Sequence, residues 1–117
     1  NTDGLLYLGN EITENPQSLK SLGEESDSVT VWGELTDVEH KDTRNGVYTI
    51  ITAALCDDTG RVPVKLFAKA EIIDDYDFLE DGAVFVMHGS YKLDTFANEM
   101  QFNPTDIMQY RSVTTIQ

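Results

Sequence analysis

The stretch that decides the fold runs from Val47 to Phe67 and reads VYTIITAALCDDTGRVPVKLF. Apolar side chains recur at every second residue on both sides of a tight turn, DDTG at 57–60, which is typical of strands that bury one face. The inward set is expected to be Thr49, Ile51, Ala53, Leu55, Val62, Val64 and Leu66. The outward set is then Tyr48, Ile50, Thr52, Ala54, Pro63, Lys65 and Phe67.

A further strand is predicted upstream, over residues 29–35. Its alternation places on one face Val29, Val31, Gly33 and Leu35, and on the other face Trp32 and Glu34. A glycine inside a strand pattern indicates a bulge or a sharp coil at that position. The polar segment 40–46 ends in Asn45-Gly46, a dipeptide that favours a hairpin turn into the next strand.

The periodicity changes after the three-strand meander. The spacing of Ile72, Ile73, Tyr76 and Leu79 predicts an amphipathic helix over about 69–80, with Gly82 shortly after its end. Strands over 83–94 and 99–110 follow, joined by a turn around 94–98. Five strands with a helix between the third and fourth is the chain order of an OB-fold. The predicted fold is therefore mainly β, a five-stranded Greek-key OB-fold barrel.

The N-terminal region is predicted to be a lead-in to this barrel. Residues 4–9 suggest a short strand or extended segment, and residues 15–23 suggest a short helical turn. Asn15 would cap that turn, Pro16 would take its first position and Gly23 would follow its end. The expected division of the chain is a lead-in packed on the barrel, the barrel, and a tail, at residues 1–27, 28–112 and 113–117.

Composition restricts the classes of function. The 117 residues carry 8 basic and 21 acidic side chains, a net charge of −13, which disfavours non-specific attraction of the whole molecule to nucleic acid or to anionic membranes. One cysteine, Cys56, cannot form an intramolecular disulfide, which favours a reducing compartment. The first ten residues lack the pattern of a signal peptide, and no apolar run is long enough to span a membrane. The expected location is the cytoplasm.

Motifs for catalysis or cofactor binding are missing from the sequence. It has no phosphate-binding loop and no dinucleotide-binding glycine pattern. Its only histidines, His40 and His88, lie outside any nucleophile motif, and with Cys56 they are too few for a zinc site. The acidic residues within 71–81 lack the spacing of a calcium loop and are predicted to form a solvated face. No cofactor and no catalytic residue are therefore expected in this chain.

Local charge favours binding on one side of the predicted barrel. Residues 59–70 hold three cations and no acid, a sum of +3, whereas residues 71–81 hold six acids and no base, a sum of −6. The turn at 40–46 has two cations and one acid, a sum of +1. Tyr48 and Phe67 point outward beside this basic segment, and single-stranded nucleic acid is held by aromatic stacking together with cations.

The chain resembles a known family over roughly residues 5–110. The matching features are a V-x-V-x-G strand start, a turn with Asp57 and Thr59, the Lys65-x-Phe67 pair, and the positions of Gly82 and Gly89. The match continues with the segment Asp94-Thr95-Phe96 and a close that comprises Asn103, Asp106 and Ile107. With the lead-in GLLYLGNEI, these residues resemble the OB-fold domain of PolC-type DNA polymerase III alpha subunits, the replicative polymerases of low-GC Gram-positive bacteria.

The resemblance implies a non-catalytic module that holds single-stranded template DNA weakly and without sequence specificity. Its parent would be a DNA polymerase with 3'-5' exonuclease activity, and its partners would include other polymerase domains and replisome subunits, with no membrane. The residues expected to contact phosphates are Lys41, Arg44, Arg61 and Lys65, and those expected to stack on bases are Tyr48 and Phe67. The groove would be closed by Lys92 and Phe96.

Two other interpretations of the same sequence remain open. An OB barrel can dock another protein, and a net charge of −13 would suit a basic partner. A contiguous outward patch of Trp32, Tyr48 and Phe67 without cations would favour this interpretation. The second alternative, ranked lower, is the anticodon-binding OB domain of an aminoacyl-tRNA synthetase.

Overall fold

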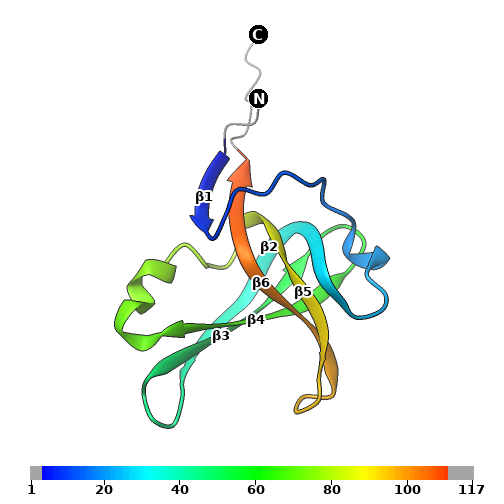
Figure 1. Ribbon diagram of the computed structural model, residues 1–117. Helices are drawn as coiled ribbons and strands as arrows, with labels where there is room; N and C mark the ends of the chain where they lie inside the picture. Colours follow the sequence, from blue (N-terminus) through cyan, green and yellow to red (C-terminus); the bar gives the residue numbers. More distant parts are fainter. Residues whose placement is uncertain (1–3, 111–117) are drawn as a thin grey trace.

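The computed structural model describes residues 4–110, which form six strands and two short 3-10 helices (Figure 1). The strands are β1 (Gly4–Leu8), β2 (Ser26–Asp42), β3 (Tyr48–Cys56), β4 (Arg61–Lys69), β5 (Val84–Asp94) and β6 (Glu99–Tyr110). The 3-10 helices are η1 (Leu19–Ser21) and η2 (Ala70–Tyr76). The predicted order of three strands, a helical segment and two strands is confirmed. The C-terminal tail expected at 113–117 lies outside the described residues.

Five of the strands close into a barrel. β2 pairs antiparallel with β3 through its second half and with β5 through its first half. β3 pairs with β4, and β6 pairs with both β5 and β4, the latter in parallel at Val64 and Phe102. This ring, β2-β3-β4-β6-β5, is the Greek-key connectivity of an OB-fold. β1 is an addition outside the ring and pairs antiparallel with the end of β6.

The core confirms the side-chain alternation expected for the central hairpin except at Ala54, which was expected outward and is buried because its small side chain lies between Thr36 and Pro63 of the flanking strands. Ile51, Leu55, Val62, Val64 and Leu66 are buried, and Tyr48 and Phe67 lie on the outer face. The largest fully buried side chains of the barrel include Phe85 and Phe102, from β5 and β6. Alternation places side chains correctly here because successive residues of a strand point to opposite faces of the sheet.

Gly33 is required by close packing and is not the site of a bulge. A Cβ at this position would lie 2.6 Å from the carbonyl oxygen of Cys56 and 2.9 Å from Cγ of Leu55. The bulge expected at Gly33 occurs further along, where the register with β3 shifts between Thr36 and Glu39 and Asp37 adopts a φ of 57°. The glycine lies where β2 changes partners, and a side chain there would push the strands apart.

The prediction of an amphipathic helix over 69–80 is wrong in the type of helix and in its length. The segment forms a 3-10 helix, η2, with non-helical dihedral angles at Ile72. Ile72 is exposed, while Ile73 and Tyr76 pack against the core and Leu79 is buried. A 3-10 helix repeats every three residues, so Ile73 and Tyr76 lie on the same side of η2 and reach the barrel, whereas Leu79 follows the end of the helix.

The N-terminal turn is also shorter than expected. η1 covers only Leu19–Ser21, so Asn15 does not cap it and Pro16 precedes it. The lead-in is attached to the barrel by backbone bonding, in which the N–H of Gln17 donates to the carbonyl of Thr30 at 2.9 Å. Leu19 is buried and belongs to the barrel core.

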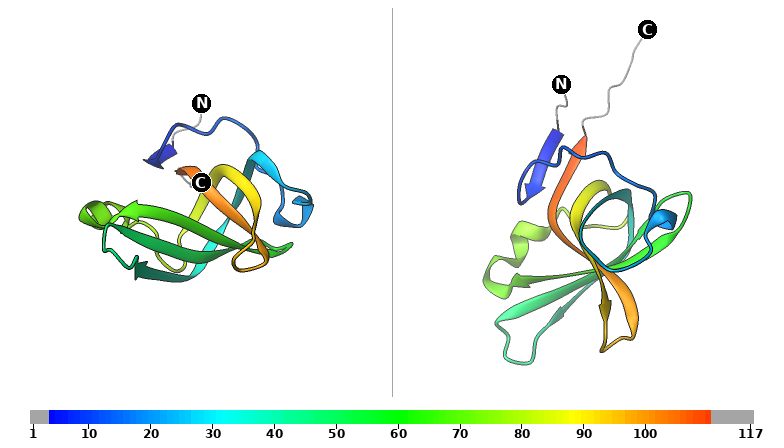
Figure 2. Two further views of the ribbon diagram at one scale, coloured as in Figure 1. Left: turned by 60° about the horizontal axis from the view of Figure 1, so that its bottom comes forward. Right: turned by 45° about the vertical axis from the view of Figure 1, so that its right-hand side comes forward.

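Two hairpins project from the same end of the barrel, as Figures 1 and 2 show. One connects β2 to β3 and the other connects β5 to β6, and β1 lies at the opposite end. In residues 4–110 no helix has the length and apolar character needed to cross a membrane.

Candidate nucleic-acid interface

The outer face of β3 and β4 gathers the predicted aromatic residues at one end. Tyr48 lies directly opposite Lys69, and Ile50 lies opposite both Phe67 on β4 and Lys41 on β2. Tyr48 is 41% exposed and Phe67 is 55% exposed. Opposite residues of paired strands share a face, so these side chains form one surface beside the β2–β3 turn. With Arg44 in that turn, we call this surface the hairpin end.

Lys65 links the hairpin end to the β5–β6 hairpin. Its Nζ lies 5.6 Å from the centroid of the Phe67 ring and 3.6 Å from a carboxylate oxygen of Asp94. The side-chain amide of Asn103 donates to the carbonyl of Lys65 at 2.9 Å, which fastens β6 against this part of β4. The Lys65 ammonium is therefore held between an aromatic ring and a carboxylate.

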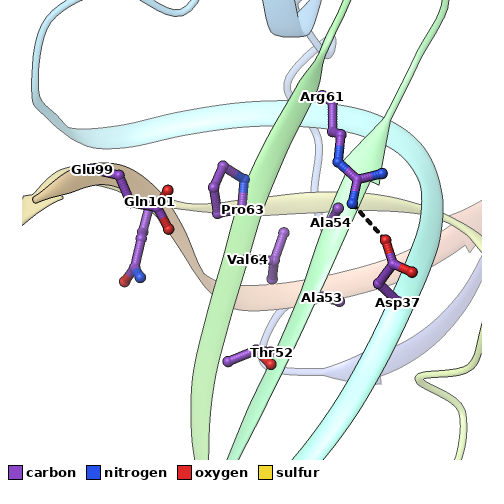
Figure 3. A pocket seen from close by; sticks show the side chains of 9 residues that line it. All are labelled: Asp37, Thr52, Ala53, Ala54, Arg61, Pro63, Val64, Glu99 and Gln101. Carbon is purple, nitrogen blue, oxygen red and sulfur yellow. Dashed lines mark hydrogen bonds and ion pairs between the residues drawn. The ribbon is translucent and has the colours of Figure 1, made fainter. Parts of the chain in front are cut away.

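Two open hollows lie between the face of β4 and the start of β6. One, of about 390 Å³, is shown in Figure 3 and is lined by Asp37, Thr52, Ala53, Ala54, Arg61, Pro63, Val64, Glu99 and Gln101. The other, of about 220 Å³, is lined by Lys65, Phe67, Lys92, Leu93, Asp94, Gln101 and Asn103. Gln101 lines both hollows, and we call the two together the groove, whose lining extends from Arg61 to Phe67.

Carboxylates neutralise several of the predicted phosphate contacts. Arg61 forms an ion pair with Asp37 across the first hollow (Figure 3), and Lys92 forms one with Asp27. The hydrogen bond from Arg61 to Asp37 raises the pKa of Arg61, and the one from Lys92 to Asp27 raises the pKa of Lys92. Lys92 in turn lowers the pKa of Asp27. These cations have carboxylate partners that a phosphate would have to displace.

Asp94 organises the tip of the second hairpin. Its carboxylate accepts hydrogen bonds from the backbone N–H groups of Phe96 and Ala97, at 2.9 and 3.4 Å. These bonds, together with Lys65, lower the pKa of Asp94 although burial opposes the shift. Phe96 itself is fully exposed beyond the groove and lines neither hollow.

The unpaired cations concentrate at the hairpin end. Within residues 4–110 the structure shows no ion pair for Lys41, Arg44 or Lys69. Lys69 is a binding candidate that the sequence reasoning missed, although it contributes to the +3 charge of 59–70. The alternation of side chains along β4 could have identified it, because Lys69 lies on the same outward face as Lys65 and Phe67. The hairpin end is thus cationic and aromatic and adjoins the groove at Phe67, whereas the far end of the groove carries Asp37 and Glu99.

His88 has a local structural role. Its Nδ1 lies 2.7 Å from Oγ1 of Thr30, and its Nε2 lies 3.0 Å from Oγ of Ser28. Both ring nitrogens are therefore engaged by side chains of β2, the strand that pairs with β5 at this position. In the described part of the chain, no three His, Cys, Asp or Glu side chains are grouped closely enough to hold a metal ion.

The ring of five strands and the groove across β3 and β4 define the chain as an OB-fold barrel. A comparison of structures agrees: RecG, in its structure bound to a three-way DNA junction, is similar with a TM-score of 0.59 and 21% sequence identity. That similarity covers 92% of this chain and 14% of the RecG chain.

By sequence, the chain is similar to the PolC-type DNA polymerase III of Halalkalibacterium halodurans. The two are 28% identical over 103 residues, which is 87% of this chain. The resemblance deduced from the motifs is confirmed by this similarity. The chain spans 7% of the length of that polymerase. No family model matches the chain.

Proposed function

We propose that this chain is a DNA-binding OB-fold module that holds single-stranded DNA across the outer face of β3 and β4. The observation that carries the proposal is the hairpin end, where Tyr48 and Phe67 are exposed beside Lys41 and Lys69. The similarity to a PolC-type polymerase and to RecG in a DNA complex supports it. In a polymerase of that type the module would hold the template strand.

The two ends of the groove would contribute differently. Aromatic rings at the hairpin end offer stacking surfaces to bases of any sequence, and Lys41, Arg44 and Lys69 offer charge to phosphates. At the other end Glu99 repels a phosphate backbone, and Asp37 engages Arg61 in an ion pair. Binding should therefore be weak, dependent on salt and confined to a few nucleotides. Arg61, Lys65 and Lys92 contribute only when their carboxylate partners are displaced.

Fluorescence anisotropy with a labelled oligo-dT at low salt tests the proposal. Tyr48→Ala and Phe67→Ala should each weaken binding by about 1–3 kcal/mol, since each removes a stacking surface. Lys41→Ala should reduce the dependence of affinity on salt. Trp32→Ala removes an exposed aromatic residue outside the groove and should leave binding unchanged. Equal losses from Tyr48→Ala and Trp32→Ala, or no salt-sensitive binding, would contradict it.

The same titrations compare the predicted residues. Phe96→Ala tests the expectation that Phe96 closes the groove, and Arg61→Ala tests a cation that already has a partner. We expect smaller losses from both than from Phe67→Ala. Oligo-U and a DNA duplex, titrated in parallel, determine whether the preference is for single-stranded DNA.

A protein-interaction role remains the second candidate. The observation that favours it is the neutralisation of Arg61, Lys65 and Lys92 by carboxylates in a chain of net charge −13. A contiguous patch of Trp32, Tyr48 and Phe67 without cations would favour this role. The structure differs, because Lys41, Lys65 and Lys69 surround Tyr48 and Phe67. A docking surface is better sought elsewhere on the barrel.

A further inference from the structure

A second hollowed surface lies where the N-terminal lead-in passes the middle of β2. Two adjoining hollows, of about 400 and 320 Å³, are both lined by Trp32 and Tyr110. Trp32 is 45% exposed and Tyr110 is 38% exposed. No residue that lines these hollows also lines the groove on β3 and β4. We call this region the Trp32 surface.

The walls of the Trp32 surface are held in place by the fold. Pro16, Gln17 and Ser18 form one wall, and the backbone bond from Gln17 to Thr30 fixes this segment beside β2. The side-chain amide of Gln109 donates to the carbonyl of Val84 at 3.1 Å and fixes the other side. A surface that needs no rearrangement loses little conformational freedom when a ligand binds.

The charge of the Trp32 surface is negative. Its lining residues include Asp57 and Asp58 and no Lys or Arg. The Asp57 carboxylate is occupied, because it accepts hydrogen bonds from Leu19, Thr59 and Gly60. Asp58 is exposed, and no hydrogen bond or ion pair engages its carboxylate within residues 4–110.

Glu34 extends this negative charge along β2. It lies two residues beyond Trp32 on the same outward face and is exposed. It pairs with Val84, which lines the hollow on that side. Asp58 in the lining and Glu34 further along β2 are therefore the charges nearest to the aromatic residues, so a ligand of complementary charge is cationic and nucleic acid is repelled.

We propose that the Trp32 surface binds an extended, basic, proline-containing segment of another protein. Exposed Trp and Tyr rings beside an apolar hollow accept proline rings, and a polyproline II segment is already extended, so it loses little entropy on binding. Arginine side chains of the segment would meet Asp58 and Glu34. The net charge of −13 adds a long-range attraction for such a partner.

Trp32 provides a direct test because it is the only tryptophan in the chain. A synthetic peptide, acetyl-Pro-Pro-Arg-Pro-Pro-Arg-Pro-amide, should produce a saturable change in tryptophan emission, and calorimetry should give the same affinity. Tyr110→Ala and Asp58→Lys should each weaken binding by about tenfold, a loss typical of an interface residue that contributes to affinity. Asp74→Lys makes the same charge change on η2 and should leave affinity within about twofold.

Other outcomes would overturn the proposal. Equal binding of a peptide with glycine in place of every proline would reduce the effect to charge alone. Emission that depends on protein concentration without peptide would identify a second copy as the occupant. A variant without residues 111–117 tests the chain's own tail as the occupant. The tail would be identified if this removal shifted the tryptophan emission and if the peptide changed the emission of the shortened chain but not of the full chain. Absence of any saturable change would reject the site.

The peptide test is independent of the DNA proposal. Tyr48→Ala should weaken binding of oligo-dT and leave the peptide affinity unchanged. Asp58→Lys should weaken binding of the peptide and leave the stacking contribution to DNA binding unchanged. Failure of either proposal therefore leaves the other intact.

Discussion

Gly33 shows how one residue position can be determined by packing alone. Its place at the crossing of β2 with the end of β3 leaves no space for a side chain, since the carbonyl oxygen of Cys56 would lie 2.6 Å from a Cβ. The contact is with backbone, which cannot rotate away as a flexible side chain can. The position therefore requires glycine for a reason that the hydrophobic pattern does not contain.

Gly33→Ala is expected to destabilise the barrel by about 1–3 kcal/mol, the usual cost of forcing extra atoms into a packed region. Urea denaturation followed by Trp32 emission measures the change. Gly23→Ala is the matched control, because a Cβ there meets nothing within 4 Å. A Gly33→Ala variant as stable as Gly23→Ala would show that the strands separate at little cost.

Asp57 holds the β3–β4 turn and the lead-in together. Burial alone would raise the pKa of Asp57, but hydrogen bonds from Thr59, Leu19 and Gly60 lower it below the ordinary value. A lowered pKa means that the ionised carboxylate is favoured in the folded state. Its stabilising effect is therefore present above the ordinary pKa and is lost as pH falls through the lowered value.

Asp57→Asn should cost about 1–3 kcal/mol near neutral pH, typical for hydrogen bonds to a charged group. The difference from the unchanged protein should shrink when pH falls below about 4, where carboxylates begin to be protonated. Urea denaturation at both pH values measures this. Asp58→Asn, at a carboxylate with no partner in the described residues, should have no comparable effect, and a difference that grew on acidification would contradict the role given to Asp57.

At the scale of elements, η2 differs most from expectation. The spacing of the apolar residues in this segment predicts an α-helix, yet the link between β4 and β5 forms a 3-10 helix with a kink at Ile72. The link starts at the end of β4 and leads to the start of β5, and the barrel sets the positions of both strands. Local periodicity cannot include this constraint, although it correctly predicted that a helical segment occurs here.

Paired substitutions distinguish the two geometries. Ile72→Ser should change stability by less than about 0.5 kcal/mol, as for other exposed positions, whereas an α-helix would require it in the core. Ile73→Ser should cost about 1–2 kcal/mol, because Ile73 packs against the core. Thermal and urea unfolding measure both. The reverse ranking would support the α-helix and contradict the 3-10 geometry.

At the scale of the whole molecule, charge is distributed in a way that weakens the groove as a DNA site. Asp27 and Asp37 come from β2, and each pairs with a cation of a different strand, Lys92 or Arg61. The acidic surplus is thus partly directed at the cations that the sequence indicated for phosphate binding. Removing these carboxylates should leave Arg61 and Lys92 available to bind phosphates of DNA.

Asp27→Asn combined with Asp37→Asn should raise the affinity for oligo-dT by several-fold. The plot of log K against log salt concentration should steepen by about 1.4, from roughly 0.7 per additional phosphate contact on a single strand. Asparagine tolerates the positive φ of Asp37, so the bulge is retained. Asp74→Asn with Asp75→Asn makes the same change in net charge on η2, and an equal steepening there would show a purely global effect.

The sequence by itself determined the strands, their order and their inward and outward faces. These follow from a period of two along a strand and from turn residues such as Asn45 and Gly46, which act over a few residues. For the same reason the alternation alone places Tyr48 and Phe67 on the outer face, where both are exposed.

Only the tertiary structure decided which cations are neutralised, where the bulge falls, and that Trp32 and Tyr110 share a surface. Lys65 and Asp94, for example, are 29 positions apart in the sequence and 3.6 Å apart in the fold. Such contacts depend on how the strands cross when the barrel closes. The physical reason is that charge pairing and surface assembly are set by distances between distant segments, which no local pattern encodes.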